Sequence, residues 1–423
     1  MSYVLPPHED VTRAPAVSSR TDEPPRAVSL WTRGFVLLCL VTVLCYCSNS
    51  LATVVLPLFV QSLGGTPVVA GLVFTSFSVT SFVLRPLIGH LIDTWSVRGT
   101  LISGGAILGS FALALVLPSI WLTLIVNAIR GIGWGAFSTS ISTGIALTSP
   151  PARRGEASGY YGVATTTAVA LAPALALWLL AATGDFAVVF GLAGAAGLAA
   201  VAATILHPRI GSGTTTFRGA FALPREGLSI GAFIERPVLL ASMLLVCITM
   251  TSPVTFAFVS LHAYAVGVDN ISLYFLAAGA TSILARVALA RLADRVSRGI
   301  WIATGYSGLL MGLAVFTTAG SIEIFIVAAI LASLGHSLVQ PALMALAMDR
   351  SAPGRLGKAM ATYSMAYRVG EGIGAPLAGV LIVAFGYAGM YFGAMAFVAL
   401  GLVLTALNWG TVGRPTPGEA IER

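Results

Sequence analysis

The sequence predicts an all-α membrane protein with twelve transmembrane helices arranged as two similar six-helix halves. Three observations predict this fold. The chain of 423 residues is 57% hydrophobic and only 9% charged, with a mean hydropathy of +0.91. A soluble domain carries about 25% charged residues, so much of this apolar surface must face lipid. The second observation is a series of long apolar runs, and the third is a set of short motifs that recurs at a nearly constant spacing.

Each predicted helix rests on the length of its apolar run, because a hydrocarbon core of about 30 Å needs about 20 residues of helix. Runs of that size lie at 34–60, 70–92, 100–117, 121–148, 157–181, 185–206, 237–264, 270–292, 300–319, 323–348, 357–383 and 387–409. The polar segments around them divide the chain into a disordered tail (1–33), a first half (34–206), a central loop (207–236), a second half (237–409) and a C-terminal tail (410–423).

The basic residues predict the orientation. Loops on one side of the predicted bundle carry arginines, such as Arg98, Arg153, Arg298 and Arg350, while the loops on the other side contain no Lys or Arg. Both tails lie on the basic side. The positive-inside rule therefore predicts a multi-pass protein of the cytoplasmic (inner) membrane with both termini in the cytoplasm.

An internal repeat relates the two halves. The matching landmarks are Arg85–Asp93 with Arg286–Asp294 (286 − 85 = 201), Gly155–Tyr161 with Gly357–Tyr363 (357 − 155 = 202), and Ala172-Pro173 with Ala375-Pro376 (375 − 172 = 203). Because six helices separate the copies, both copies begin on the same side of the membrane and form parallel repeats. Such repeats place a solute site near the midplane, between the halves. Arg85 and Arg286 are expected to extend from their helices to the cytoplasmic surface.

This constellation resembles the major facilitator superfamily over essentially the whole chain after Arg33, and it is most similar to bacterial small-molecule efflux members. The family signature after the second helix is matched by Gly89, Asp93 and Arg98. The basic residue that normally follows the acid is missing there, but the second copy supplies it as Asp294-Arg295.

Two further motifs carry the resemblance. Arg130 and the glycines after it resemble an element that the family links to proton coupling. The family's antiporters also have a G-x-x-x-G-P element on the fifth helix. This chain keeps only Pro173 there, with alanines for glycines, but has Gly370, Gly374 and Pro376 on the eleventh helix, which implies a hinge or packing motif.

The charged residues of the repeated loop have a mechanical interpretation. An acid near a helix end with arginines close by can form a charge-assisted contact that is made in one conformer and broken in the other. The predicted conformational latch consists of Gly89, Asp93, Arg98, Asp294, Arg295 and Arg298. The alternative is a set of solvated loop charges that only fix the topology.

Charges deep in a membrane are costly and are functional candidates by default. Away from the ends of the predicted spans, these are Arg130, Arg368 and Glu371. Glu371 is the only carboxylate near the middle of a span, and it lies one helical turn from Arg368. Burial favours the neutral form of an acid, whereas an adjacent arginine favours the ionised form. We expect Glu371 to bind the coupling proton, with Arg130 or Arg368 as the competing cation.

Two alternatives to proton coupling stay open, namely a static Arg368–Glu371 ion pair and substrate binding by either charge. Many drug–proton antiporters of the family have an acid in the first helix, where residues 48–50 of this chain are Ser, Asn and Ser.

The resemblance implies that helices one, four, seven and ten line a solute cavity. Their polar or aromatic members are Asn49, Thr53, Trp134, Ser138, Thr251, Thr255, His336 and Gln340. His336 occupies the position that matches Trp134 in the repeat (336 − 134 = 202), and it serves either packing or function. Two arginines against one acid favour an anionic or zwitterionic organic solute.

The function classes that the sequence excludes are clear. It contains no phosphate-binding loop and no H-E-x-x-H motif, and its five histidines are scattered, so we expect no enzyme activity, cofactor or metal. The arginines form no basic face for nucleic acid. We therefore predict a monomer in the lipid bilayer that exports a small organic solute by alternating access coupled to proton antiport. The alternatives are an importer or uniporter of the same fold and a non-transporting membrane receptor or enzyme.

Overall fold

The computed structural model describes residues 31–149, 153–206, 234–268, 270–289, 297–352 and 356–412. The helices of the first half are α1 (Arg33–Ser62), α2 (Pro67–Val83), α3 (Arg85–Thr94), α4 (Val97–Ala114), α5 (Ile120–Thr148), α6 (Arg154–Thr183) and α7 (Phe186–Leu206). Those of the second half are the 3-10 turn η2 (Arg236–Val238), α10 (Leu239–Thr249), the π-helix η3 (Val254–Phe258), α11 (Val259–Ala265), α12 (Ser272–Leu289), α13 (Arg298–Phe316), α14 (Ile322–Asp349), α15 (Leu356–Leu407) and α16 (Trp409–Val412).

The all-α membrane fold is confirmed. Nine helices within the described residues are long and apolar enough to cross a membrane. One of them, Thr362–Leu407, changes direction at Gly386 (φ 70°) and therefore covers the two runs predicted at 357–383 and 387–409. The shorter helices α2, of 17 residues, and α12, of 18 residues, occupy two further predicted runs. The number of twelve spans stays a prediction.

Proline explains two interruptions within predicted runs. The run at 70–92 divides into α2 and α3 at Leu84, since Pro86 donates no backbone hydrogen bond and its ring clashes with the carbonyl of the preceding turn. The run at 237–264 is broken between Thr249 and Val254, where Pro253 precedes the π-helix η3. Single π-turns inside helices are frequent at functional sites, so this second interruption is relevant to the cavity described below.

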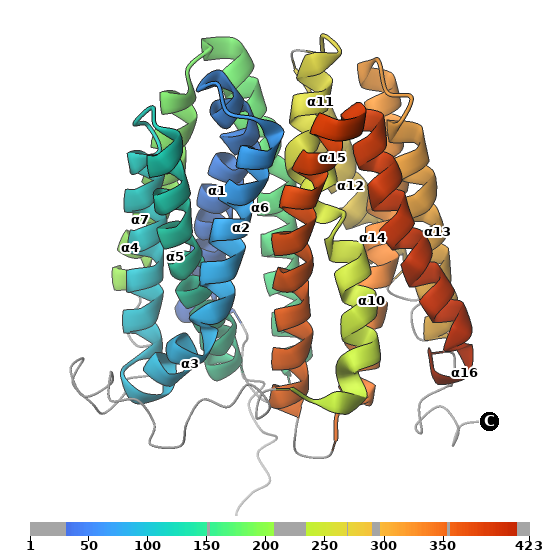
Figure 1. Cartoon of the computed structure of the whole chain (residues 1–423). Helices are drawn as coiled ribbons and strands as arrows, with labels where there is room; N and C mark the ends of the chain where they lie inside the picture. Colours follow the sequence, from blue (N-terminus) through green and yellow to red (C-terminus); the bar gives the residue numbers. More distant parts are fainter. Residues whose placement is uncertain are drawn as a thin grey trace, which may run out of the picture.

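The two halves stand side by side in Figure 1, with α1–α7 (blue to green) on the left and α10–α16 (yellow to red) on the right. Helix α2 packs against α15, and α6 packs against α12, across the boundary. Small residues permit this approach. A Cβ atom built on Gly71 of α2 would lie 2.5 Å from the carbonyl oxygen of Ala375 on α15, and the Thr75 hydroxyl donates to the Gly372 carbonyl (2.8 Å).

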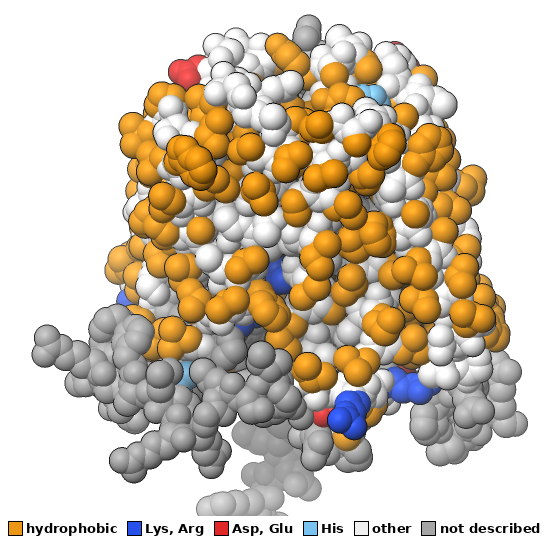
Figure 2. All heavy atoms as spheres, viewed as in Figure 1, with side chains coloured by type: hydrophobic (Ala, Val, Ile, Leu, Met, Phe, Trp, Pro, Cys, Tyr) orange, Lys and Arg blue, Asp and Glu red, His pale blue; other side chains and the backbone are white. Residues whose placement is uncertain are grey.

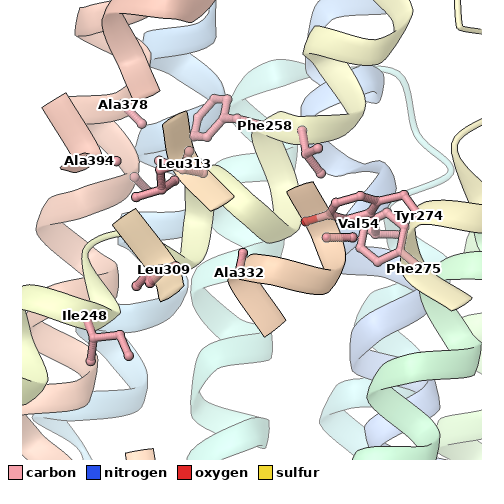
Figure 3. Packing of buried hydrophobic residues seen from close by; sticks show 14 of the residues in the cluster. Val54, Ile248, Phe258, Tyr274, Phe275, Leu309, Leu313, Ala332, Ala378 and Ala394 are labelled. Carbon is pink, nitrogen blue, oxygen red and sulfur yellow. The ribbon is translucent and has the colours of Figure 1, made fainter. Parts of the chain in front are cut away.

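The apolar core shows where the halves are joined. One cluster of buried residues runs through both halves and includes Val54 of α1 together with Phe258, Tyr274 and Phe275 of the second half (Figure 3). A separate cluster belongs to the first half alone and contains residues near the basic loops, such as Phe35. The first half therefore contributes to the shared cluster only at the end away from the basic loops. Helix α1 also contacts η3 and α11 across the boundary.

The outer surface suits a lipid environment. Figure 2 shows hydrophobic side chains over the visible face, while basic side chains gather at its lower edge, apart from blue atoms visible between the halves. Large apolar side chains are exposed along the bundle, including Trp121 (77%), Phe385 (71%) and Leu284 (68%). Of the predicted polar segments, residues 1–30, 207–233 and 413–423 lie outside the described residues, and the C-terminal tail predicted from 410 begins inside α16.

Candidate functional site

A cavity of about 540 Å³ lies between the two halves. Its wall is built from α1, α2, α5 and α6 on one side and from η3, α12, α14 and α15 on the other. Sites for small molecules typically enclose 300–1,000 Å³. The cavity therefore has the size for a small organic solute and the location that the internal repeat predicts.

The structure brings six of the eight predicted cavity residues to this wall, namely Asn49, Thr53, Trp134, Thr255, His336 and Gln340. The other two do not line it. Thr251 is fully buried and its hydroxyl donates to the Ile248 carbonyl (2.7 Å), while the Ser138 hydroxyl donates to the Gly135 carbonyl (3.4 Å). The expectation for Thr251 assumed a continuous helix. Because the helix is interrupted before η3, residues on its two sides no longer follow one helical periodicity.

Aromatic rings form much of the wall. Tyr46, Phe77 and Trp134 line the cavity from the first half, and the Tyr46 and Trp134 rings meet edge to face with centroids 4.8 Å apart. Tyr274 and Phe275 of α12 face them from the second half. Such a lining suits a solute with an apolar or aromatic body.

Arg368 and Glu371 form an ion pair on the cavity wall. The Nη1 atom of Arg368 lies 2.7 Å from Oε2 of Glu371, and the two side chains keep 13% and 23% of their surface exposed. The guanidinium also lies over the Tyr367 ring at 5.4 Å. Glu371 is the only acidic side chain among the described residues that line the cavity.

Arg130 lies behind the wall rather than on it. Its side chain is fully buried and donates to Oδ1 of Asn127 (2.8 Å) and of Asn49 (3.5 Å), and Asn127 in turn donates to the Val73 carbonyl (2.8 Å). No described acidic side chain pairs with Arg130. Arg130 and Arg368 therefore do not share Glu371, and only Arg368 contacts it directly.

Arg286 is the cavity residue that sequence reasoning missed. It was expected to reach the cytoplasmic surface, but it lines the cavity from α12, and its Nη1 atom lies near Gly162 of α6. Within the described part of the chain it has no acidic partner. Its repeat mate Arg85 lies within electrostatic range of Arg368 and Glu371.

The latch residues are only partly described. Arg298 forms an ion pair with Asp349 at the end of α14, and Nη2 of Arg98 donates to the Ile205 carbonyl at the end of α7 (2.6 Å). Gly89 lies within α3. The side chain of Asp93, and all of Asp294 and Arg295, lie outside the described residues, so the latch stays a prediction.

The predicted hinge or packing motif lies at two helix contacts. Cβ atoms on Gly370 and Gly374 would collide with Thr249 and Met250, so these glycines let α15 pack closely on α10. Pro376 approaches Gly71 across the two halves, and Pro173 is buried within α6. Among the described residues, no group of three His, Cys, Asp or Glu side chains is placed to hold a metal ion.

Comparison with known proteins agrees with this architecture. The chain is 26% identical over 395 residues to an uncharacterised MFS-type transporter of Burkholderia mallei (strain SAVP1), covering 90% of this chain and 94% of that protein. It is 32% identical over 175 residues to the uncharacterised transporter YebQ of Escherichia coli (strain K12), an alignment that spans 39% of this chain and 37% of YebQ. The crystal structure of a mutant of the nucleoside transporter NupG has the same fold, with a TM-score of 0.71 at 13% identity over 89% of this chain and 99% of that one. The profile of the Major Facilitator Superfamily matches residues 38–322 and 261–422, and the chain therefore belongs to this superfamily of membrane transporters.

Proposed function

We propose that this transporter moves a small organic solute through the cavity by alternating access, coupled to the binding and release of a proton at Glu371. The observation that carries the proposal is the position of the Glu371 carboxylate on the cavity wall, paired with Arg368 at 2.7 Å. A carboxylate that faces each side of the membrane in turn can take up a proton on one side and release it on the other.

Alternating access is supported by the asymmetry of the core. The first half contributes to the shared apolar cluster at the end away from the basic loops, whereas its described residues nearer those loops form a cluster of their own. With the basic side in the cytoplasm, as the positive-inside rule predicts, this asymmetry favours a state that faces the cytoplasm. The other state requires the halves to rock about the fixed cavity.

The direction of transport has two candidates. The resemblance to efflux members favours export of the solute in exchange for incoming protons. A second candidate, movement of the solute together with protons, is favoured by the excess of guanidinium groups over carboxylates at the cavity. Protonation of Glu371 would leave Arg368 without its anion, and a proton and an anionic solute would then strengthen each other's binding.

The solute and the role of Glu371 can be tested in the same cells. Metabolites would be measured inside and outside cells that lack the protein, cells with it restored, and cells with the Glu371→Gln variant. Glu323→Gln is the matched control, since Glu323 lies outside the cavity at the opposite end of the bundle from the basic loops. A compound that is trapped inside the deletion cells, released on restoration and trapped again by Glu371→Gln identifies an exported solute. A compound depleted inside the deletion cells identifies uptake.

Flux in liposomes then gives the sign of coupling. A pH gradient should drive the solute in the wild type and in Glu323→Gln, against the proton flow for exchange and along it for joint transport. Glu371→Gln should lose the response to the gradient while retaining solute exchange between equal concentrations. Gradient-driven transport at the wild-type rate in Glu371→Gln would leave Glu371 as a structural ion-pair partner. Absence of flux with every identified compound would favour a receptor.

A further inference from the structure

We infer that the cavity takes an organic anion with an apolar body, whose acidic group is held at Arg286. The inference deepens the proposed function, because it names the substrate class of the same cavity and rests on transport through it. It does not depend on the direction of transport.

The first argument is the unpaired charge of Arg286. Arg286 lines the cavity with an exposed side chain, so its guanidinium is accessible to an anion that enters. No acidic side chain within the described residues pairs with it. A planar guanidinium binds carboxylate, sulfonate or phosphate oxygens through two parallel hydrogen bonds.

The second argument is the charge balance of the cavity wall. Arg286 and Arg368 contribute two positive charges to the wall, and Arg85 adds a third within electrostatic range, against the single carboxylate of Glu371. Glu371 compensates only one of these guanidinium groups. The field inside the cavity therefore attracts anions and repels cations.

The third argument comes from the remaining lining. The indole Nε1–H of Trp134 is buried and has no acceptor within the described structure. It can donate to an oxygen of a bound anion, but it offers nothing to an ammonium group. The rings of Phe77 and Tyr274 and the other aromatic groups on the wall provide contact area for an apolar body.

The inference can be tested by binding to the purified protein in lipid nanodiscs, with probes that share one aromatic body and carry an anionic, a neutral or a cationic group. The probes are 1-naphthalenesulfonate, the neutral 1-naphthalenesulfonamide and the cationic 1-naphthylmethylammonium, with the benzene analogues as a smaller series. We expect the sulfonate to bind at least about tenfold more tightly than the sulfonamide, and the ammonium to bind most weakly. Arg286→Gln should weaken sulfonate binding by about tenfold and leave sulfonamide binding unchanged.

Two variants separate charge from damage to the fold. Arg286→Lys should retain part of the preference for the anion, because the charge is kept while the planar donor pair is lost. Arg33→Gln should bind all three probes as the wild type does, since Arg33 is exposed at the start of α1 and does not line the cavity.

Three results would overturn the inference. In the first, the sulfonate binds no better than the sulfonamide in both series, or shows no measurable binding. In the second, the ammonium binds most tightly. In the third, Arg286→Gln weakens the binding of all probes equally. None of these results bears on proton coupling at Glu371, which the liposome experiment tests. Conversely, a preference for the anion would stand even if Glu371→Gln transported normally.

Discussion

At the residue scale, the position of Arg130 depends on neutral partners. Asn127 accepts from Arg130 and donates to the Val73 carbonyl, so it links the buried charge on α5 to the backbone of α2. Asn127→Ala leaves both groups without these bonds in a buried site, and we expect a loss of about 1–3 kcal/mol in the free energy of unfolding. The measurement is thermal unfolding in detergent.

The matched control is Ser142→Ala on the same helix. Ser142 is exposed, and its hydroxyl bonds only to carbonyls of its own helix, so its removal should change the unfolding temperature little. Equal unfolding temperatures for Asn127→Ala and Ser142→Ala would show that the Asn127 bridge contributes nothing to stability.

At the scale of elements, the contact between α2 and α15 depends on the absence of a side chain at Gly71. An alanine there would place its Cβ 2.5 Å from the Ala375 carbonyl oxygen, and backbone cannot rotate away as a side chain can. Gly71→Ala should therefore cost about 1–3 kcal/mol and lower the unfolding temperature. Gly191→Ala in α7 is the control, because nothing lies within 4 Å of its Cβ, and it should stabilise the helix by about 0.5–1 kcal/mol. Similar losses from both variants would contradict close packing at Gly71.

A second element, α11, contributes to closure of the end away from the basic loops. It contacts α1 across the halves, and His262 anchors it to α15 by stacking on Tyr387 (4.8 Å) and by a hydrogen bond between Nδ1 and the Tyr391 hydroxyl (3.1 Å). His262→Leu leaves the buried Tyr391 hydroxyl without this bond, so we expect the closed end to open more often.

Labelling of a cysteine at Val54 measures this opening, because Val54 is fully buried in the cluster that joins the halves. In a background without the four native cysteines, an impermeant thiol reagent added outside should label Val54→Cys about tenfold faster when His262→Leu is present. Tyr264→Phe on the same helix alters an exposed side chain and should leave the rate unchanged. If His262→Leu also leaves the rate unchanged, α11 is not held by this anchor.

At the scale of the whole molecule, hydrophobic run length and the internal repeat were sufficient to predict the all-α architecture and the place of the cavity. The spacing of Arg368 and Glu371 predicted that they share a helix face, and their ion pair was one of the alternatives left open. Run length and the repeat did not predict the placement of Thr251, since the π-turn after Pro253 interrupts the periodicity on which the prediction rested. Arg286 was missed for a different reason. The sequence places it near a span end, and only the packing of α12 against α6 turns that position into cavity wall.

The difference between the two ends of the molecule predicts which side of the membrane reaches the cavity. Ser333 of α14 lines the cavity, and the first half contributes to the shared apolar cluster only at the end away from the basic loops. Ser333→Cys, in the background without native cysteines, should therefore react with an impermeant thiol reagent at least about tenfold faster in inside-out vesicles than in intact cells. Asp185→Cys reports the opposite side, because Asp185 lies exposed in the short loop between α6 and α7, and it should react faster in intact cells. Faster labelling of both positions in intact cells would mean that the cavity opens outward at rest. If Asp185→Cys alone reacts faster in inside-out vesicles, the orientation that the basic loops predict is wrong.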